Sequence, residues 1–262
     1  MYKQAIWNLG ELAPNHKSPE FTKQIARLES KVKNFEKIKS KLTPSIKSKE
    51  FFEIIHSIES LTEDASRLGG YASLLYSSNT QSDEATSLMT KISKLGSEIE
   101  NKTLFFDLWW KRKIDEKNAN RLIKDAGGIS EFLRHKRLLV KYSLSEPEEK
   151  IINTLDVTGS TALVKLYDKI TNAFEYIITV NGKKKKLTRE QLSVLVRSNN
   201  PNLRKTAYQT LLGKFDSNKG VLGEIYQNLV LNWKDEGIEI RKYSSPISIR
   251  NIGNDVDDKT IQ

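Results

Sequence analysis

Three long stretches of the sequence repeat apolar residues at intervals of three and four, and this spacing constrains the fold more than any other feature. The stretches are residues 21–42, 51–75 and 88–110. Such spacing places the apolar side chains on one face of an α-helix. Because only the short polar segment 77–80 separates the second stretch from the third, we expect two long antiparallel helices joined by a turn.

Capping residues and prolines mark the expected helix ends. Ser18-Pro19-Glu20 is typical of a helix start, and Thr43-Pro44 ends the first long helix because proline disfavours helix at the residue before it. The segment 237–251 is predicted to be a turn, and a new helix start is predicted at residues 254–258. Shorter helices are predicted at residues 115–125, 129–140, 146–155, 160–172, 192–197, 204–215 and 221–235.

One segment has the alternating pattern of a β-strand. Apolar and polar residues alternate over residues 174–180, and Asn181-Gly182 follows at once, which predicts a hairpin turn because both residues accept positive φ. The return strand would hold four consecutive lysines, residues 183–186. These lysines form a basic patch for a partner or protect an exposed sheet edge, and we favour protection. Thr188 and Gln191 then have the spacing of a capping box.

The sequence therefore predicts a mainly α fold, with a long antiparallel helical hairpin, a bundle of shorter helices and one β-hairpin near residues 174–187. We expect two domains. Residues 1–112 would form an N-terminal arm and the long hairpin, and residues 113–262 a helical lobe that contains the β-hairpin and is truncated at its C-terminus. Because the chain stops at Gln262, inside a predicted helix start, we expect it to be a fragment of a longer protein.

The composition favours a soluble, cytoplasmic protein. The 262 residues include no cysteine, which excludes disulfides and thiolate metal sites. No run of about eighteen apolar residues is present, so we expect no membrane partner. The 43 Lys and Arg exceed the 33 Asp and Glu and give a net charge of +10, yet the two signs are interleaved along the helices. Interleaving is typical of solvated helix faces, so we do not expect nucleic acid as a partner.

Residues 104–110 collect leucine, phenylalanine and tryptophan side chains. Trp109 and Trp110 could stack on a ligand, but large aromatic side chains on a long helix more often belong to a core. We therefore predict that this aromatic segment is buried.

The sequence contains no evident catalytic constellation. Its three histidines are far apart: we expect His16 to be solvated or to cap a helix, and the basic neighbours of His135 disfavour a metal. Glu53 and His56 have the Glu-x-x-His spacing of carboxylate-bridged di-iron bundles, but such a site needs a second copy of the motif and two more glutamates. Motifs for phosphate loops, dinucleotides and nucleophilic serines are absent.

Five segments carry a family resemblance through their order along the chain. They are residues 7–9, 67–73, 180–188, 204–208 and 239–248. In this order they resemble the N-terminal portion of the oligoendopeptidase F family, zinc metallopeptidases related to thimet oligopeptidase. The last two segments are the most specific, and the resemblance covers essentially the whole chain.

The resemblance implies an almost wholly helical, two-lobed protein with a deep channel that admits short peptides and excludes folded proteins. In such a protein, an H-E-x-x-H helix and a further glutamate hold zinc, and the motif glutamate activates the zinc-bound water. This sequence has no H-E-x-x-H, so no catalytic or metal-binding residue is carried over to it. We expect the chain to bind no cofactor, to be inactive alone, and to need a C-terminal catalytic part that holds the zinc.

The resemblance also places Arg241, Tyr243 and Arg250 in the segment expected to approach the channel, where cations could meet a peptide carboxylate or carbonyl group. Alternatively, the two arginines cap helix ends or pair with Asp255 and Asp257. The rival hypothesis for the whole chain is a self-contained helical module that binds peptides or partner helices through residues 104–110.

Overall fold

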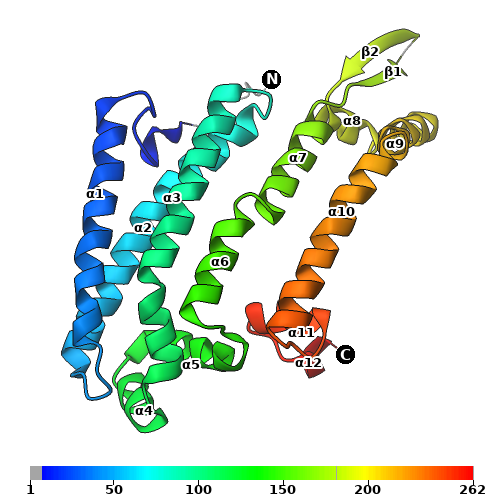
Figure 1. Cartoon of the computed structure of the whole chain (residues 1–262). Coiled ribbons are helices and arrows are strands. Elements are labelled where there is room, and N and C mark those ends of the chain that lie inside the picture. The colour runs from blue at the N-terminus through cyan, green and yellow to red at the C-terminus, as the bar shows by residue number, and fades with distance from the viewer. Residues whose placement is uncertain (1–7, 181, 262) are drawn as a thin grey trace. The chain divides into compact units, whose positions relative to one another are not determined.

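The computed structural model describes residues 8–180 and 182–261, and most of them are helical (Figure 1). Contacts group the chain into two compact units: unit 1 is Met1–Val157 with Glu236–Gln262, and unit 2 is Thr158–Asp235. The mainly α fold class is confirmed. The domain division between residues 112 and 113 remains a prediction, and Trp7 of the first family-like segment lies outside the described residues.

Unit 1 begins with three long helices that lie side by side over the three periodic stretches (Figure 1). They are α1 (Pro19–Glu36), α2 (Ser48–Ser78) and α3 (Asp83–Leu108). The first α-helix ends at Glu36, earlier than the predicted end at Thr43-Pro44. Shorter α-helices complete the unit: α4 (Glu116–Lys124), α5 (Ser130–Leu138), α6 (Glu146–Asp156), α11 (Pro246–Gly253) and α12 (Asp258–Ile261). Single turns lie between them: η1 (Leu9–Glu11), η2 (Lys37–Lys41), η3 (Trp109–Lys113), η4 (Gly127–Ile129), η5 (Leu139–Tyr142) and η6 (Asp235–Ile240).

The helix starts follow the predicted capping chemistry. The Ser18 hydroxyl accepts a hydrogen bond from the N–H of Phe21, and Pro19 occupies the first helical position of α1. The Ser82 hydroxyl caps α3 in the same way, by accepting from the N–H of Ala85. Each cap satisfies one of the N–H groups that a helix start leaves unpaired.

The aromatic segment at the end of α3 is buried, as predicted. Trp110 is 1% exposed and packs on Phe51, with ring centroids 5.2 Å apart. Its indole Nε1 donates to the carbonyl of Leu133 at 3.1 Å, so the polar atom of this ring is satisfied inside the core. The aromatic side chains of this segment therefore do not offer the binding surface that the rival hypothesis requires.

Helix α2 continues without a break through Gly69 and Gly70. A Cβ atom on Gly70 would lie 3.8 Å from Leu12 of the N-terminal arm, whereas one on Gly69 would meet no atom within 4 Å. Of the two glycines, Gly70 is therefore the one that lies against the arm.

Unit 2 consists of four helices and the predicted hairpin. The helices are α7 (Ser160–Asn172), α8 (Arg189–Leu195), α9 (Pro201–Asp216) and α10 (Lys219–Lys234). Strands β1 (Tyr176–Val180) and β2 (Lys183–Leu187) pair antiparallel, with Tyr176 opposite Leu187 and Val180 opposite Lys183. Thr188 and Gln191 form the predicted capping box at the start of α8. The core of this unit is small: Tyr176, Ile178, Leu192 and Ala207 are its buried members.

The prediction of a turn over residues 237–251 was wrong in its second half, where α11 forms. Ser245 caps this helix and Pro246 takes its first position, so the proline begins the helix. The predicted helix start over residues 254–258 is confirmed at its last residue, because α12 begins at Asp258. Asn254 is instead the C-cap of α11, and Asp255 has a φ of 56°, a left-handed conformation that ends a helix.

Within residues 8–180 and 182–261, no helix combines the length and the apolar character that crossing a membrane would require.

Candidate functional site

A polar pocket of about 230 Å³ lies in unit 1, lined by α3, α6, η5 and the chain that follows η6. Two of the three predicted substrate-binding residues, Arg241 and Tyr243, line it. Its charged and aromatic wall is formed by Glu100, Asp107, Lys111, Tyr142, Glu149, Arg241 and Tyr243.

Arg241 and Glu149 form the central ion pair of this pocket. Nη1 and Nη2 of Arg241 each donate to one carboxylate oxygen of Glu149, both at 2.8 Å. Nε donates to Glu236 at 2.8 Å, and Nη1 also donates to the carbonyl of Tyr142 at 3.2 Å. The two paired side chains are only 18% and 11% exposed. Two parallel hydrogen bonds fix the relative orientation of the two groups. The pair therefore holds residues 236–261, called here the return segment, against α6.

The ion pair controls the protonation of both partners. Burial by itself raises the pKa of Glu149, but hydrogen bonds from Arg241 and from the N–H of Leu144 outweigh it, so the pKa lies below its usual value. The hydrogen bond to Glu149 raises the pKa of Arg241. Both groups are therefore charged at neutral pH, and the centre of the pocket is a closed ion pair.

Two further carboxylates of the pocket have opposite pKa shifts. Burial raises the pKa of Glu100, and the negative charges of Glu149 and Asp107 raise it further. Burial also opposes ionisation of Asp107, but the ammonium groups of Lys136 and Lys111, at 2.7 and 2.5 Å, hold its pKa below the usual value. The pocket thus combines a carboxyl with a raised pKa and ionised carboxylates that are paired with basic side chains.

A stack of two tyrosines closes one side of the pocket. The rings of Tyr142 and Tyr243 are nearly parallel, at 10°, with centroids 3.6 Å apart. Lys242, between Arg241 and Tyr243, has a φ of 63°. A left-handed conformation costs a residue with a side chain about 1–2 kcal/mol, so the contacts on both sides of Lys242 must hold it in place. Burial raises the pKa of Tyr243.

The structure brings Arg241 and Tyr243 together and leaves Arg250 apart from them. Arg250 is exposed on α11 and is not among the residues that line the pocket. The alternative in which Arg241 pairs with Asp255 or Asp257 was wrong. Instead, Asp255 Oδ1 lies 2.9 Å from His135 Nδ1, and Asp257 accepts a hydrogen bond from the N–H of Thr260. Whether the three predicted residues bind a substrate remains a prediction.

Glu149 was not predicted as a site residue, because in the sequence it is one of three acids in the first turn of α6. Glu148 has the capping role, since its side chain accepts from the Ser145 N–H and closes a capping box. Glu149 is one position further along α6, about 100° around the helix, and faces the pocket. This angular offset could be read from the sequence, but it does not identify the partner of Glu149, because Arg241 lies 92 residues further along the chain.

The three histidines lie in separate places and each contacts a single carboxylate. His16 pairs with Glu84 and His56 with Glu59, in addition to the His135 contact. His16 is mostly buried beside Tyr71, so the prediction that it is solvated or a cap was wrong. Within the described residues, no three histidine or acidic side chains are grouped so that they could hold a metal ion. These residues do not fit a zinc site.

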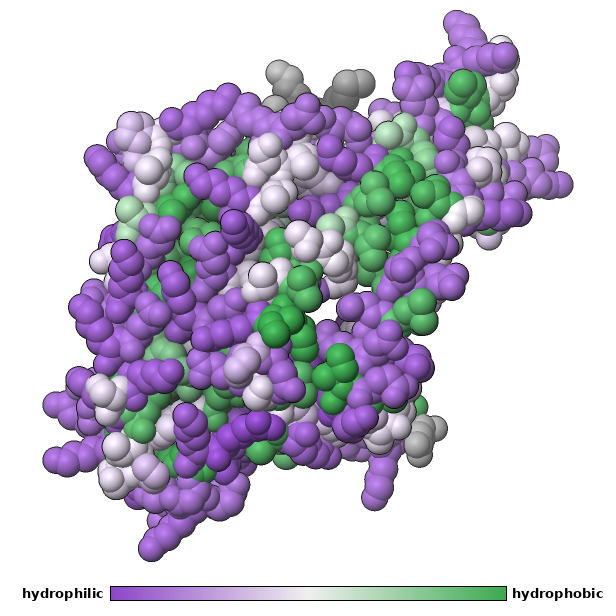
Figure 2. All heavy atoms as spheres, viewed as in Figure 1, coloured by the Kyte–Doolittle hydropathy of each residue, from purple (hydrophilic) through white to green (hydrophobic). Residues whose placement is uncertain are grey.

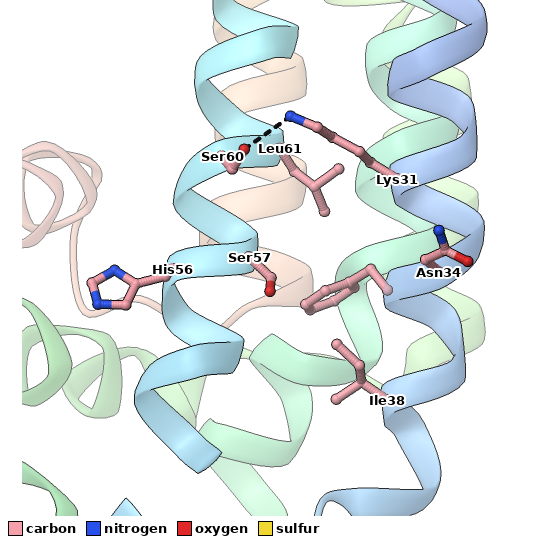
Figure 3. Close-up of a pocket in the computed structure, with 8 residues that line it drawn as sticks. Lys31, Asn34, Ile38, His56, Ser57, Ser60 and Leu61 are labelled. Carbon is pink, nitrogen blue, oxygen red and sulfur yellow. Dashed lines mark hydrogen bonds between the residues drawn. The ribbon is translucent and has the colours of Figure 1, made fainter. Parts of the chain in front are cut away.

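A second cavity, of about 420 Å³, lies between α1 and α2 (Figure 3). Lys31 crosses it from α1 and donates to Ser60 at 2.9 Å and to Asp64 at 2.5 Å on α2. In Figure 3, His56 points away from Ser60 and from the α1 side of the cavity, and it bonds Glu59 on its own helix. The described residues that line this cavity therefore do not place a histidine beside a hydroxyl nucleophile.

The chain is similar to a known protein family and to a solved structure. Residues 112–176 match the family model described as Oligopeptidase F. The predicted resemblance to oligoendopeptidase F is confirmed. The matched residues 112–176 include Tyr142 and Glu149 of the polar pocket, whereas Arg241 and Tyr243 lie beyond them.

The fold is similar to the crystal structure of oligoendopeptidase-F from Enterococcus faecium, with a TM-score of 0.75 and 16% sequence identity. The similarity covers 91% of this chain and 47% of the oligoendopeptidase-F chain, so this chain spans about half the length of that protein. No curated protein matches the sequence significantly.

Proposed function

We propose that this chain is the N-terminal, non-catalytic part of a zinc-dependent oligoendopeptidase that hydrolyses short peptides in a deep channel. The observation that carries the proposal is the agreement of two comparisons: a family match over residues 112–176 and a shared fold over 91% of the chain. In this proposal, the protein acts in the cytoplasm on short peptides.

The catalytic zinc belongs, in this proposal, to a C-terminal part that this sequence does not contain. The sequence has three histidines and no H-E-x-x-H motif, and its described residues do not fit a zinc site. Zinc would supply the activated water in the complete protein. The role of this chain would be to form a wall of the channel, and alone it would be inactive.

Arg241, Tyr243 and Arg250 are the residues proposed for peptide binding, and their roles differ. The charge of Arg241 is already matched by Glu149, so this residue would position Tyr243 and the pocket wall. Arg250 is exposed and would meet the carboxylate of a peptide. The rival hypothesis, a self-contained binding module, lacks support because the aromatic side chains it needs lie in the core.

The test is cleavage of a quenched fluorescent peptide by this chain and by a chain extended through the downstream reading frame. Each protein is assayed with zinc and with a chelator. We expect only the extended chain to cut the peptide, and only without the chelator. Zinc-dependent cleavage by the short chain would contradict the proposed inactivity, and no cleavage by either would contradict the peptidase assignment.

A further inference from the structure

The positive charge of the chain is concentrated in unit 2. Residues 158–235 contain 13 Lys and Arg against 6 Asp and Glu, so these 78 residues carry +7 of the net charge of +10. Clustered charge of one sign raises the local concentration of ligands of the opposite sign. Unit 2 is therefore the part of the chain suited to an acidic partner.

The β-hairpin carries the densest part of this charge and has two unlike faces. Tyr176 and Ile178 of β1 point into the core, so Ile177, which is 63% exposed, points outward. Directly opposite residues in an antiparallel pair share a face. Lys186 lies opposite Ile177, and Lys184 lies opposite Thr179. The outer face thus consists of two lysines beside an exposed isoleucine. Figure 2 shows a mostly hydrophilic surface over this hairpin, with a hydrophobic spot in it.

Of the two lysines on this face, only Lys186 has a carboxylate partner in the described part of the chain. In unit 1, Lys31, Lys111 and Lys150 each reach a carboxylate within 2.7 Å. In the hairpin, Lys186 contacts Glu175, but both side chains are more than half exposed and such a pair contributes little. No carboxylate in the described part of the chain lies within ion-pair distance of Lys184.

Protection of a sheet edge does not account for this face. A protective lysine needs only to keep another strand from pairing, whereas Lys184 and Lys186 stand two residues apart on one face and repel each other. Strand β1 offers no acid opposite them, only Thr179 and Ile177. The repulsion is relieved when an external anion binds between the two ammonium groups.

We propose that the outer face of this hairpin, formed by Ile177, Lys184 and Lys186, is a docking surface for acidic oligopeptides. Glutamate or aspartate side chains would lie against the two lysines, and an apolar side chain of the same peptide would cover Ile177. The assignment to a peptide rests on the proposed function, since short peptides are the proposed substrates. Substrates that contain both acidic and apolar residues would then be preferred.

The experiment measures binding of a fluorescent octapeptide of alternating glutamate and leucine to this chain by anisotropy. The matched probe replaces each glutamate with glutamine. We expect the acidic peptide to bind more tightly than the matched probe, and its affinity to fall as salt is raised from about 50 to about 500 mM, because salt screens exposed charges. Equal binding of the two peptides would overturn the proposal.

The variant K184Q/K186Q should weaken binding of the acidic peptide about fivefold or more, and I177S should also weaken it. The control K91Q/K205Q removes the same charge from exposed positions elsewhere and should leave binding within about twofold. All these positions are exposed, and matched melting curves would show that each variant is folded. An unchanged affinity in K184Q/K186Q would overturn the proposal. Tighter binding of a single-stranded DNA 20-mer, lost in the same variant, would assign the surface to nucleic acid instead.

This test can fail independently of the proposed function, because it measures binding to the short chain and not cleavage. Binding that depends on Lys184 and Lys186, without cleavage by the extended chain, would support the docking surface and contradict the peptidase. Cleavage of acidic and neutral peptides at equal rates, unaffected by K184Q/K186Q, would support the peptidase and contradict the docking surface.

Discussion

Replacement of Arg241 by methionine tests the central ion pair of the polar pocket. Methionine keeps the apolar stem but removes four hydrogen bonds: two to Glu149 and one to Glu236, each 2.8 Å long, and one to the carbonyl of Tyr142 at 3.2 Å. The Glu149 carboxylate is then left mostly buried, with only the Leu144 N–H as a partner among the bonds described. Removal of one partner from a buried pair costs about 3–5 kcal/mol, which for a chain of this size lowers Tm by on the order of 10 °C.

The matched control is Arg134→Met. Arg134 donates to Glu131 at the same distance, 2.8 Å, but both side chains are more than half exposed. Exposed pairs contribute about 0–1 kcal/mol, so this variant should melt within a few degrees of the unmodified chain. If both variants lost the same stability, burial would not be what makes the Arg241 pair important.

The pH dependence of the two melting curves gives a sharper test. In the unmodified chain the pKa of Glu149 lies below its usual value of 4.5, so its contribution is complete above that value and is lost as pH falls through the folded-state pKa. In Arg241→Met, burial is no longer opposed by the arginine, and the pKa of Glu149 should rise above its unfolded value. Protonation then favours the folded variant, whose stability relative to the unmodified chain should recover as pH is lowered from 7 to 4.

A double-mutant cycle with Glu149→Gln isolates the pair. The neutral amide relieves the buried charge that Arg241→Met leaves behind, so the double variant should be more stable than the sum of the single losses predicts. We expect a coupling energy of about 2 kcal/mol. A coupling near zero, or a Tm difference that does not change between pH 7 and 4, would refute the reasoning that Glu149 is a desolvated carboxylate held ionised by Arg241.

Three other substitutions test separate parts of the fold by thermal unfolding. Gly237→Ala should cost about 1–3 kcal/mol of stability, because the added Cβ would lie 2.2 Å from the side chain of Ile249. In the control Gly96→Ala the added Cβ meets no atom within 4 Å, so this change should stabilise α3 by about 0.5–1 kcal/mol. Equal effects of the two changes would contradict the steric reason. Tyr176→Phe should raise stability by about 1 kcal/mol, because the buried hydroxyl has no hydrogen-bond partner in the described structure; a clear loss would show that a partner exists. Trp110→Ala should cost about 3–5 kcal/mol, and a loss below 1 kcal/mol would show that the aromatic segment is not core.

The long helices could be predicted from the sequence because their signals are local. Periodic apolar residues and caps such as Ser18 depend on neighbours within a few positions, and the structure places α1, α2 and α3 over the expected stretches. The hairpin followed for the same reason, since Gly182 has a φ of 74° where a turn needs positive φ.

The pocket could be predicted only in part, because its contacts join distant segments. Arg241 and Tyr243 were placed at a functional segment by resemblance, but their partners Glu149 and Tyr142 come from α6 and η5. The α11 helix was missed for a different reason. Ser245-Pro246 begins this helix in the same way as Ser18-Pro19 begins α1, but no long run of periodic apolar residues follows it to distinguish a helix start from a turn.

Arg241 and Glu149 both belong to unit 1, and the chain between them includes all of unit 2. Fixing this contact closes a loop of 92 residues, which for a flexible chain costs about 4 kcal/mol in entropy plus a constant. The net stabilisation from a buried ion pair is smaller than the about 3–5 kcal/mol lost when one partner is removed. The pair alone could therefore not offset the entropy cost of closing an unfolded loop of that length. Folding of residues 158–235 shortens the flexible part and lowers this cost.

Leu192→Ala, in the small core of unit 2, should therefore increase hydrogen exchange in residues 236–261 as well as in its own unit. The physical reason is that an unfolded unit 2 lengthens the loop that Arg241 must close, and no contact between Leu192 and the return segment is needed. Exchange measured by mass spectrometry under mild denaturant separates the two regions. If exchange rose only within residues 158–235, the return segment would be held by its own contacts, and loop entropy would not link the units.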